Sequence, residues 1–196
     1  KGESEPFLGR ALKKYPRNSF YLATKLPVWL VNSVEDAERL FKEQLSRLQT
    51  KYIDYYLLHA LDAGRWEKLV KEGIIEWAEA KKASGKIRHL GFSFHDTYPV
   101  FREILTYRQW DFCQIQYNYI NLTHQAGTEG LKYAASKGLG VVIMEPLLGG
   151  KLANLAPHVA EAFPEGKSHV EYALDFLWDK PEVSLLLSGM TEPEQV

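Results

Sequence analysis

Two residues that can hold or transfer a proton, Lys25 and His59, follow successive apolar runs of the sequence. The run 19–25 ends on Lys25, and the run 52–58 is followed directly by His59. An ammonium group at such a position must reach solvent or meet an anion, because its burial alone is costly. A neutral imidazole can donate a hydrogen bond to a carbonyl or relay a proton near neutral pH. The pair therefore indicates either a surface lysine beside a core histidine, or a site where Lys25 lowers the pKa of a neighbouring acid.

Polar residues in later apolar runs have the chemistry to recognise a flat ligand that carries an amide. Ser93 and Gln114 offer hydrogen-bond donors and acceptors, which recognition of a carboxamide requires. Glycine-containing segments at 149–152 and 188–191 follow the last two apolar runs, where barrel proteins often bind phosphate. None of these features is specific by itself, and Gln114 can equally bond a neighbouring loop.

Short apolar runs and longer helical patterns alternate along the chain, and these elements would position the polar residues. Because no Gly-x-Gly-x-x-Gly follows any run, a barrel is favoured over a dinucleotide-binding open sheet. We expect residues 1–196 to form one α/β domain, a (β/α)8 TIM barrel of which about six β/α units are present. The predicted strands are 20–23, 52–58, 87–94, 112–117, 141–144 and 183–187, and the predicted helices are 5–14, 33–48, 66–82, 98–107, 128–137 and 168–180.

Composition excludes several classes of partner. The net charge of −1 gives no field that would attract nucleic acid or an acidic membrane surface. No apolar run approaches the roughly 18 to 20 residues of a membrane-spanning helix. The single cysteine, Cys113, lies in an apolar run without a disulfide companion, which is typical of a reducing compartment. We therefore expect a cytoplasmic protein that binds neither nucleic acid nor membranes.

The chain resembles the aldo-keto reductase family over essentially its whole length. The resemblance implies a barrel that binds NADP(H), with NAD possible, and reduces a small-molecule aldehyde or ketone by hydride transfer. The matching segments, in family order, are KGESEPFLGRALKK, FYLATKLP, LSRLQTKYIDYYLLHAL, ASGKIRHLGFSFHD, CQIQYNYIN, GLGVVIMEPLLGGKL and SLLLSGMTEPEQV.

The resemblance also implies roles for individual residues. Lys25 and His59 would be catalytic: His59 would orient the substrate carbonyl, and Lys25 would lower the pKa of a tyrosine that supplies the proton. Trp29, after the first strand, is expected to be a wall of the substrate pocket. The cofactor-binding positions would be Ser93, Gln114, Met144, Pro146, Leu147, Gly149, Lys151, Ser188, Gly189, Thr191 and Gln195.

Several positions depart from the family pattern. Met144 stands where many members stack a tyrosine on the nicotinamide, and Phe94 stands where many place an asparagine. Gln195 stands where many use an arginine for the 2′-phosphate, which leaves the choice between NADP and NAD open. The family's tyrosine, its aspartate and its first two strands precede the segment that matches GESE. We therefore expect a truncated stretch, lacking also the C-terminal end, that holds half of the catalytic tetrad and is inactive alone.

Other functions remain open besides an NAD(P)H-dependent carbonyl reductase. The same fold serves non-catalytic regulatory subunits that bind a nicotinamide cofactor, because fold does not fix function. A metal-dependent barrel hydrolase needs histidine and carboxylate ligands at several strand ends. Here those ends carry lysine, serine and glutamine, so no metal site is expected and the sequence favours the reductase.

Overall fold

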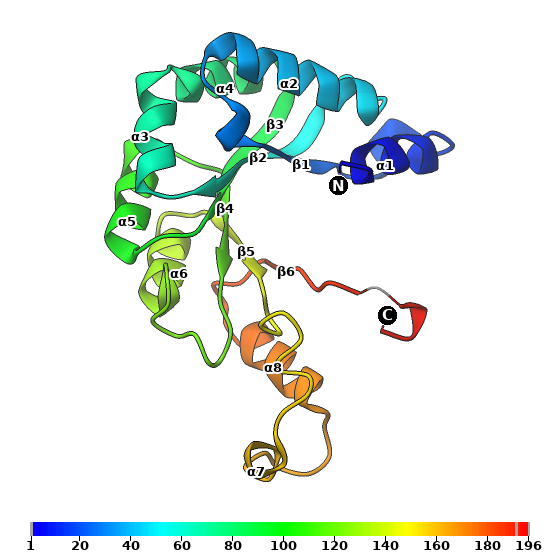
Figure 1. Cartoon of the computed structure of the whole chain (residues 1–196), viewed down its shortest axis with the longest axis vertical. Helices are drawn as coiled ribbons and strands as arrows, with labels where there is room; N and C mark the ends of the chain where they lie inside the picture. Colours follow the sequence, from blue (N-terminus) through cyan, green and yellow to red (C-terminus); the bar gives the residue numbers. More distant parts are fainter. Residues whose placement is uncertain (1, 191, 196) are drawn as a thin grey trace. The chain divides into compact units, whose positions relative to one another are not determined.

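Strands and helices alternate along the chain, as the sequence predicts (Figure 1). The computed structural model describes residues 2–190 and 192–195. The strands form one parallel sheet in the order β1-β2-β3-β4-β5-β6, which does not close into a barrel. Two compact units divide the chain, Lys1–Ser93 and Phe94–Val196, and each is described by itself. The single domain expected from the sequence stays a prediction.

The first unit is built from βα repeats in which helices cover a parallel sheet. Helix α2 packs against α1, α4 and β1, and Figure 1 shows these elements in blue to green. The helices are α1 (Ser4–Leu12), α2 (Val34–Arg47), α3 (Ala63–Lys71) and α4 (Ile74–Ala83), with short 3-10 turns η1 (Arg17–Ser19) and η2 (Val28–Leu30). The strands are β1 (Ala23–Leu26), β2 (Ile53–Leu61) and β3 (Ile87–Phe94).

Aromatic rings fill the core between α2, α4 and β2. The ring of Phe41 meets Tyr56 and Trp77 edge-on, with centroids 5.2 and 5.8 Å away. Such edge-to-face contacts add to the stabilisation that burial of apolar area provides. The buried Tyr56 hydroxyl donates to Gln44 Oε1 at 2.7 Å, so its polar group is satisfied inside the core.

The helix predicted over residues 66–82 is in fact two helices. α3 ends at Lys71 and α4 begins at Ile74, because Gly73 between them has a φ of +69°. A left-handed residue interrupts the helical hydrogen-bond ladder, and glycine adopts this conformation without steric cost. The apolar spacing continues across Gly73, which is why the sequence pattern indicated one helix.

The predicted helix starts differ in how well they match the structure. Ser33 caps α2 by accepting a hydrogen bond from the Asp36 N–H at 3.3 Å. Ser168 forms a full capping box with Glu171 at the start of α8 (His169–Trp178). At α1, however, Ser4 is the first helical residue, and the N-cap residue Glu3 makes no capping hydrogen bond through its side chain. A serine side chain thus caps α2 and α8 but not α1.

The second unit continues the alternation of strands and helices. Strand β4 is buried throughout and pairs in parallel with β5, with Gln116 opposite Met144. Burial raises the pKa of the Cys113 thiol to about 12, as for a core residue.

The helices are α5 (Tyr98–Tyr107), α6 (Gly127–Ser136), α7 (Pro157–Ala160) and α8, and the strands are β4 (Phe112–Gln116), β5 (Gly140–Met144) and β6 (Leu185–Leu186), followed by η3 (Pro193–Gln195). Helix α7 was not predicted, and β6 is shorter than the predicted run. No helix of the described residues is both long and apolar enough to span a membrane.

Gly9 of α1 packs tightly against the end of α2, and its replacement by alanine is expected to be strongly destabilising. A Cβ atom at Gly9 would lie 2.1 Å from the carbonyl oxygen of Arg47, so one of the two helices must move. We expect Gly9→Ala to lower the free energy of unfolding by about 2 kcal/mol or more, measured by urea denaturation.

Gly64 in α3 provides the matched control. The nearest atom to a Cβ at Gly64 is Asp62 Oδ1 at 3.8 Å, which is an ordinary contact. Gly64→Ala should raise the free energy of unfolding by about 0.5 kcal/mol, because alanine has the higher helix propensity. Equal effects of the two replacements would contradict the close packing of α1 on α2.

Candidate active site

Lys25 and His59 lie on the same face of the paired strands β1 and β2. Lys25 is opposite Leu57 in the parallel register, and His59 follows Leu57 by two residues. Side chains alternate between the two faces of a strand, so Leu57 and His59 point to the same face. Lys25, opposite Leu57, points to that face as well. The strand extends further than the predicted 52–58, because β2 runs from Ile53 through His59 to Leu61. The register nevertheless brings the amine and the imidazole to one side of the sheet.

The Lys25 side chain is half-buried, and its backbone is held by α2. The Gln44 amide Nε2 donates to the Lys25 carbonyl oxygen at 2.8 Å, and Tyr56 in turn donates to Gln44. Desolvation by burial lowers the pKa of the Lys25 ammonium below its ordinary value. Within residues 2–190 and 192–195, no acidic side chain counteracts this shift. Lys25 is therefore a poorly solvated cation in the described part of the chain.

Trp29 covers the ring of His59. Its indole belongs to η2, directly after β1, and the two ring centroids are 5.0 Å apart at an angle of 54°. Half of the Trp29 surface is exposed, and His59 itself is only partly buried, so the two rings meet near the protein surface. This contact fits a residue that walls a site, and the pocket role of Trp29 stays a prediction.

Ser93 is linked to the backbone next to His59. The buried Ser93 Oγ, on the penultimate residue of β3, accepts a hydrogen bond from the Ala60 N–H at 2.7 Å. The Ala60 carbonyl oxygen accepts a second bond from the Arg65 guanidinium at 2.6 Å. Ala60 itself has a φ of +57°, which is rare for a residue other than glycine. Sequence reasoning missed Ala60 and Arg65, since neither residue type signals a left-handed backbone.

In the second unit, Gln114 and Met144 are in direct contact. The Gln114 amide Nε2 donates to the Met144 thioether sulfur at 3.1 Å. Gln114 lies in the middle of β4 rather than at its end, and Met144 is the last residue of β5. Glu145, which follows Met144, has a φ of +55°, and its carbonyl oxygen accepts from Asn118 Nδ2 at 3.1 Å. No role was predicted for Asn118 or Glu145 from the sequence.

The remaining predicted cofactor residues lie in loops of the second unit. Pro146 is buried and Leu147 half-buried after β5, whereas Gly149 and Lys151 are exposed. Ser188 and Gly189 are exposed after β6, and Gln195 ends η3. Thr191 lies outside the described residues. The structure thus brings together Lys25, His59, Trp29 and Ser93 in one unit, and Gln114 with Met144 in the other.

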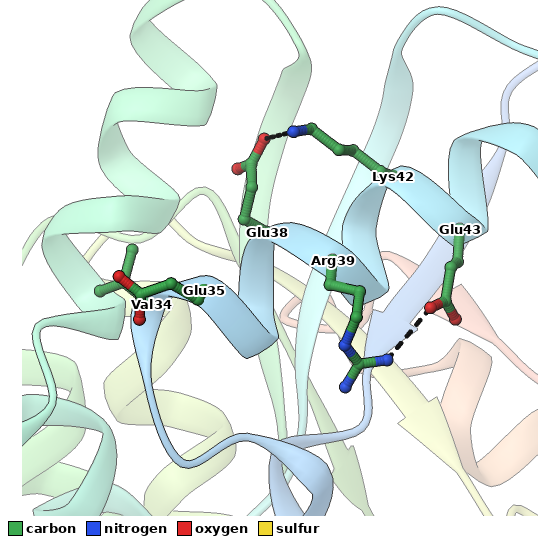
Figure 2. Close-up of a pocket in the computed structure, with 6 residues that line it drawn as sticks. All are labelled: Val34, Glu35, Glu38, Arg39, Lys42 and Glu43. Atoms are coloured by element: carbon green, nitrogen blue, oxygen red, sulfur yellow. Dashed lines mark hydrogen bonds and ion pairs between the residues drawn. The ribbon is translucent and has the colours of Figure 1, made fainter.

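A charged surface hollow on α2 contains none of the predicted site residues. Figure 2 shows its lining, in which Lys42 reaches Glu38 at 3.4 Å and Arg39 reaches Glu43 at 3.0 Å. On its other side, Glu38 bonds Lys81 and the Trp77 indole N–H, and these bonds lower the pKa of Glu38 to about 2. Because its lining comes from consecutive turns of one helix, the hollow is a solvated helix face with paired charges.

Comparison with known proteins identifies the family. The model of the aldo/keto reductase family matches residues 1–196. The chain belongs to the aldo/keto reductase family. This confirms the resemblance seen in the sequence, and it places the chain among oxidoreductases that use nicotinamide cofactors to reduce carbonyl groups.

Individual relatives support the same assignment. The chain is 28% identical to L-galactose dehydrogenase of Arabidopsis thaliana, covering 98% of the chain and 67% of that protein. It is 31% identical to the NADH-specific methylglyoxal reductase of Escherichia coli, covering 77% of the chain and 50% of that protein. The aldo-keto reductase AKR11C1 of Bacillus halodurans superposes with a TM-score of 0.84 at 27% identity, over 97% of the chain and 68% of that structure. The chain thus spans about half to two thirds of these family members, and its open six-stranded sheet matches part of the expected (β/α)8 barrel.

Proposed function

We propose that the protein reduces an aldehyde or a ketone by hydride transfer from a nicotinamide cofactor. The observation that carries this proposal is the pair formed by Lys25 and His59, a half-buried ammonium group and an imidazole on one face of adjacent parallel strands. Membership of the aldo/keto reductase family supports it independently. When bound, NAD(P)H supplies the hydride.

His59 and Lys25 have separable roles in this proposal. The imidazole donates a hydrogen bond to the carbonyl oxygen of the substrate and fixes its orientation beneath the Trp29 ring. The Lys25 ammonium favours the anionic form of a phenol that acts as proton donor, so that the pKa of this acid moves towards neutrality. A cation that already lacks solvation interacts strongly with such a neighbour, because little water screens it.

Two polar residues have the chemistry that a nicotinamide carboxamide requires. Ser93 accepts from the Ala60 N–H and therefore keeps its own hydroxyl proton for a carbonyl oxygen. The NH₂ group of Gln114 donates a hydrogen bond to the Met144 sulfur, which leaves the amide oxygen Oε1 to accept from an N–H donor. Ser93 and Gln114 are therefore each a candidate for a hydrogen bond to the carboxamide, and Met144 is a candidate for a polarisable contact with the pyridine ring.

The enzymatic proposal is tested on the protein in its native length. Consumption of NADPH and of NADH is followed by absorbance with simple aldehydes and with methylglyoxal, the substrate named for the bacterial relative. Oxidation of L-galactose, named for the plant relative, tests the reverse direction. We expect carbonyl-dependent consumption of at least one cofactor. Quenching of tryptophan fluorescence by cofactor without any turnover would instead favour a regulatory cofactor-binding subunit.

We further propose that the protein accepts both NADP(H) and NAD(H), with a weak preference between them. Gln195 carries no charge, and its side-chain oxygen accepts from the Glu192 N–H at 3.1 Å. A neutral side chain between Glu192 and nearby Glu194 offers little attraction to a 2′-phosphate. The bacterial relative is named as NADH-specific, which supports the use of NADH.

Introducing an arginine at this position is expected to shift the cofactor preference. Gln195→Arg should raise the ratio of kcat/KM for NADPH over NADH by about tenfold, because arginine can bind a phosphate bidentately. The matched control is Gln109→Arg, which adds the same charge at an exposed position after α5. An equal shift in both variants would point to net charge alone and contradict the role of residue 195.

The partner proposed for this protein is a small-molecule carbonyl compound, and the proposed location is the cytoplasm. The buried and unpaired thiol of Cys113 supports a reducing compartment. The near-zero net charge supports the absence of nucleic-acid and membrane partners.

A further inference from the structure

The backbone that follows His59 is held in a conformation that alanine rarely adopts. With φ at +57°, the Cβ atom of Ala60 crowds its own backbone, which is why glycine dominates this region. Ala60 nevertheless lies within β2, one residue before the strand ends at Leu61. A strained residue persists only where its surroundings fix it, and such residues cluster at functional sites.

Side chains from two other elements fix both polar backbone groups of Ala60. Ser93 of β3 accepts from the Ala60 N–H at 2.7 Å, and Arg65 of α3 donates to the Ala60 carbonyl oxygen at 2.6 Å. Neither bond belongs to the pairing pattern of a sheet. The conformation of Ala60 is therefore imposed by Ser93 and Arg65 rather than by the strand.

Arg65 is itself anchored at the start of α3. The N-cap residue of this helix, Asp62, accepts from the Arg65 backbone N–H at 2.8 Å through Oδ1. Its other oxygen, Oδ2, lies 3.1 Å from the Arg65 guanidinium. One planar guanidinium thus connects the capped helix terminus to the Ala60 carbonyl, which a flexible ammonium would do less rigidly.

The same combination occurs once more beside a predicted site residue. Glu145 directly follows Met144, has a φ of +55°, and its carbonyl oxygen is held by Asn118 Nδ2 at 3.1 Å. Gln49 also has a positive φ, of 52°, but it lies at the end of α2, away from His59 in the sequence and without a predicted role. Gln49 therefore serves as a comparison for strain that is not tied to the site.

We propose that Arg65 is a positioning residue for His59. Ser93, through the Ala60 N–H, fixes the peptide plane between His59 and Ala60, and Arg65, through the Ala60 carbonyl oxygen, fixes the next plane, between Ala60 and Leu61. Arg65 thereby completes the restraint on the left-handed backbone of Ala60, and with it sets the direction in which the imidazole leaves the strand. The Trp29 ring, 5.0 Å from the imidazole, limits the directions that remain. This inference deepens the proposed function and rests on the role of His59 in carbonyl reduction.

Two arginine variants of the native-length protein test the proposal by kinetics. Arg65→Met should lower kcat by about 10- to 100-fold, because a small misplacement of a catalytic group is costly, whereas the cofactor Kd changes by less than about threefold. Arg65→Lys, which keeps one cationic donor, should restore part of the activity. The control is Arg39→Met, since Arg39 is an exposed arginine whose ion pairs lie on α2. This control should leave kcat unchanged.

Nuclear magnetic resonance of the imidazole gives a readout that does not depend on turnover. The Trp29 ring current shifts the Cε1–H signal of His59, so this signal reports the orientation of the imidazole. We expect the signal to move towards the position of a free histidine in Arg65→Met and to return in part in Arg65→Lys. A further pair separates strain from position: Ala60→Gly should move the signal, whereas Gln49→Gly should not.

The outcomes distinguish this inference from the proposed function. An Arg65→Met protein with an unmoved His59 signal would overturn the positioning role, whatever its activity. A moved signal together with a reduced kcat supports it. If the unmodified protein reduces no carbonyl compound, the proposed function fails, and the His59 signal alone then decides whether Arg65 positions the imidazole.

Discussion

Replacement of Lys25 by methionine is expected to lower turnover by about 10³-fold while the affinity for the cofactor stays within about threefold. Methionine resembles lysine in length but carries no charge, so the stem still packs while the ammonium is lost. The half-buried ammonium of Lys25 has a lowered pKa because of desolvation, and the variant removes the charge that would activate the proton donor. The loss should therefore appear in kcat and not in binding.

Three measurements on Lys25→Met separate chemistry from folding. Steady-state assays give kcat, fluorescence titration gives the cofactor Kd, and urea denaturation gives the free energy of unfolding. This free energy should stay the same or rise, because a desolvated cation is unfavourable in the folded state. The control is Lys42→Met, which removes an exposed lysine of α2 and should change none of the three values. Equal losses of binding and turnover in Lys25→Met would contradict the assigned role.

The largest effect on stability is expected at Asp54, where Asp54→Ala should lower the free energy of unfolding by about 3 kcal/mol. The Asp54 carboxylate is buried, and Oδ2 accepts from Arg17 at 2.6 Å and from the Leu22 N–H at 2.9 Å. Oδ1 accepts from Arg88 at 3.1 Å. The guanidinium groups of Arg17 and Arg88 also stack on the Tyr52 ring, at 4.0 and 4.1 Å from its centroid. Without the carboxylate, the buried N–H of Leu22 loses its acceptor and both guanidinium groups lose their counter-ion.

An exposed carboxylate with a similar number of partners provides the comparison for Asp54. Glu43 pairs with Arg39 at 3.0 Å and with Arg47 at 3.3 Å, but all three side chains are at least one third exposed. Glu43→Ala should therefore change the free energy of unfolding by less than about 1 kcal/mol, because water screens such pairs. Urea denaturation measures both variants. Similar losses for the two would show that burial does not set the strength of the Asp54 contacts.

The repeated βα pattern could be predicted because local signals and tertiary packing agree there. The helix expected over 98–107 has those bounds in α5, and the helix expected from residue 168 begins there, with Ser168 as the N-cap of α8. The break at Gly73 was missed because the apolar spacing continues through it. Helical period alone cannot report a single left-handed residue.

Some residues of the candidate site could be predicted from the sequence and others could not, and the difference has a physical reason. Lys25 and His59 could be found because each is a polar residue at the end of an apolar run, and parallel register then brings them to one face. Ala60 and Arg65 could not, because the left-handed Ala60 depends on Ser93, which is 33 residues away. Contacts of that range follow from the fold and leave no local pattern.

One buried amide on α2 links several segments that bear on Lys25. Gln44 Nε2 bonds the Lys25 carbonyl oxygen at 2.8 Å and Glu5 at 3.1 Å, while its oxygen accepts from Tyr56. Residues that share one network change stability non-additively when they are replaced together. Substitutions at Gln44 and Lys25 should therefore be epistatic. In directed evolution of the enzyme, a substitution at Gln44 alters which residues position 25 tolerates. Libraries that vary the two sites separately will miss the combinations that work only together.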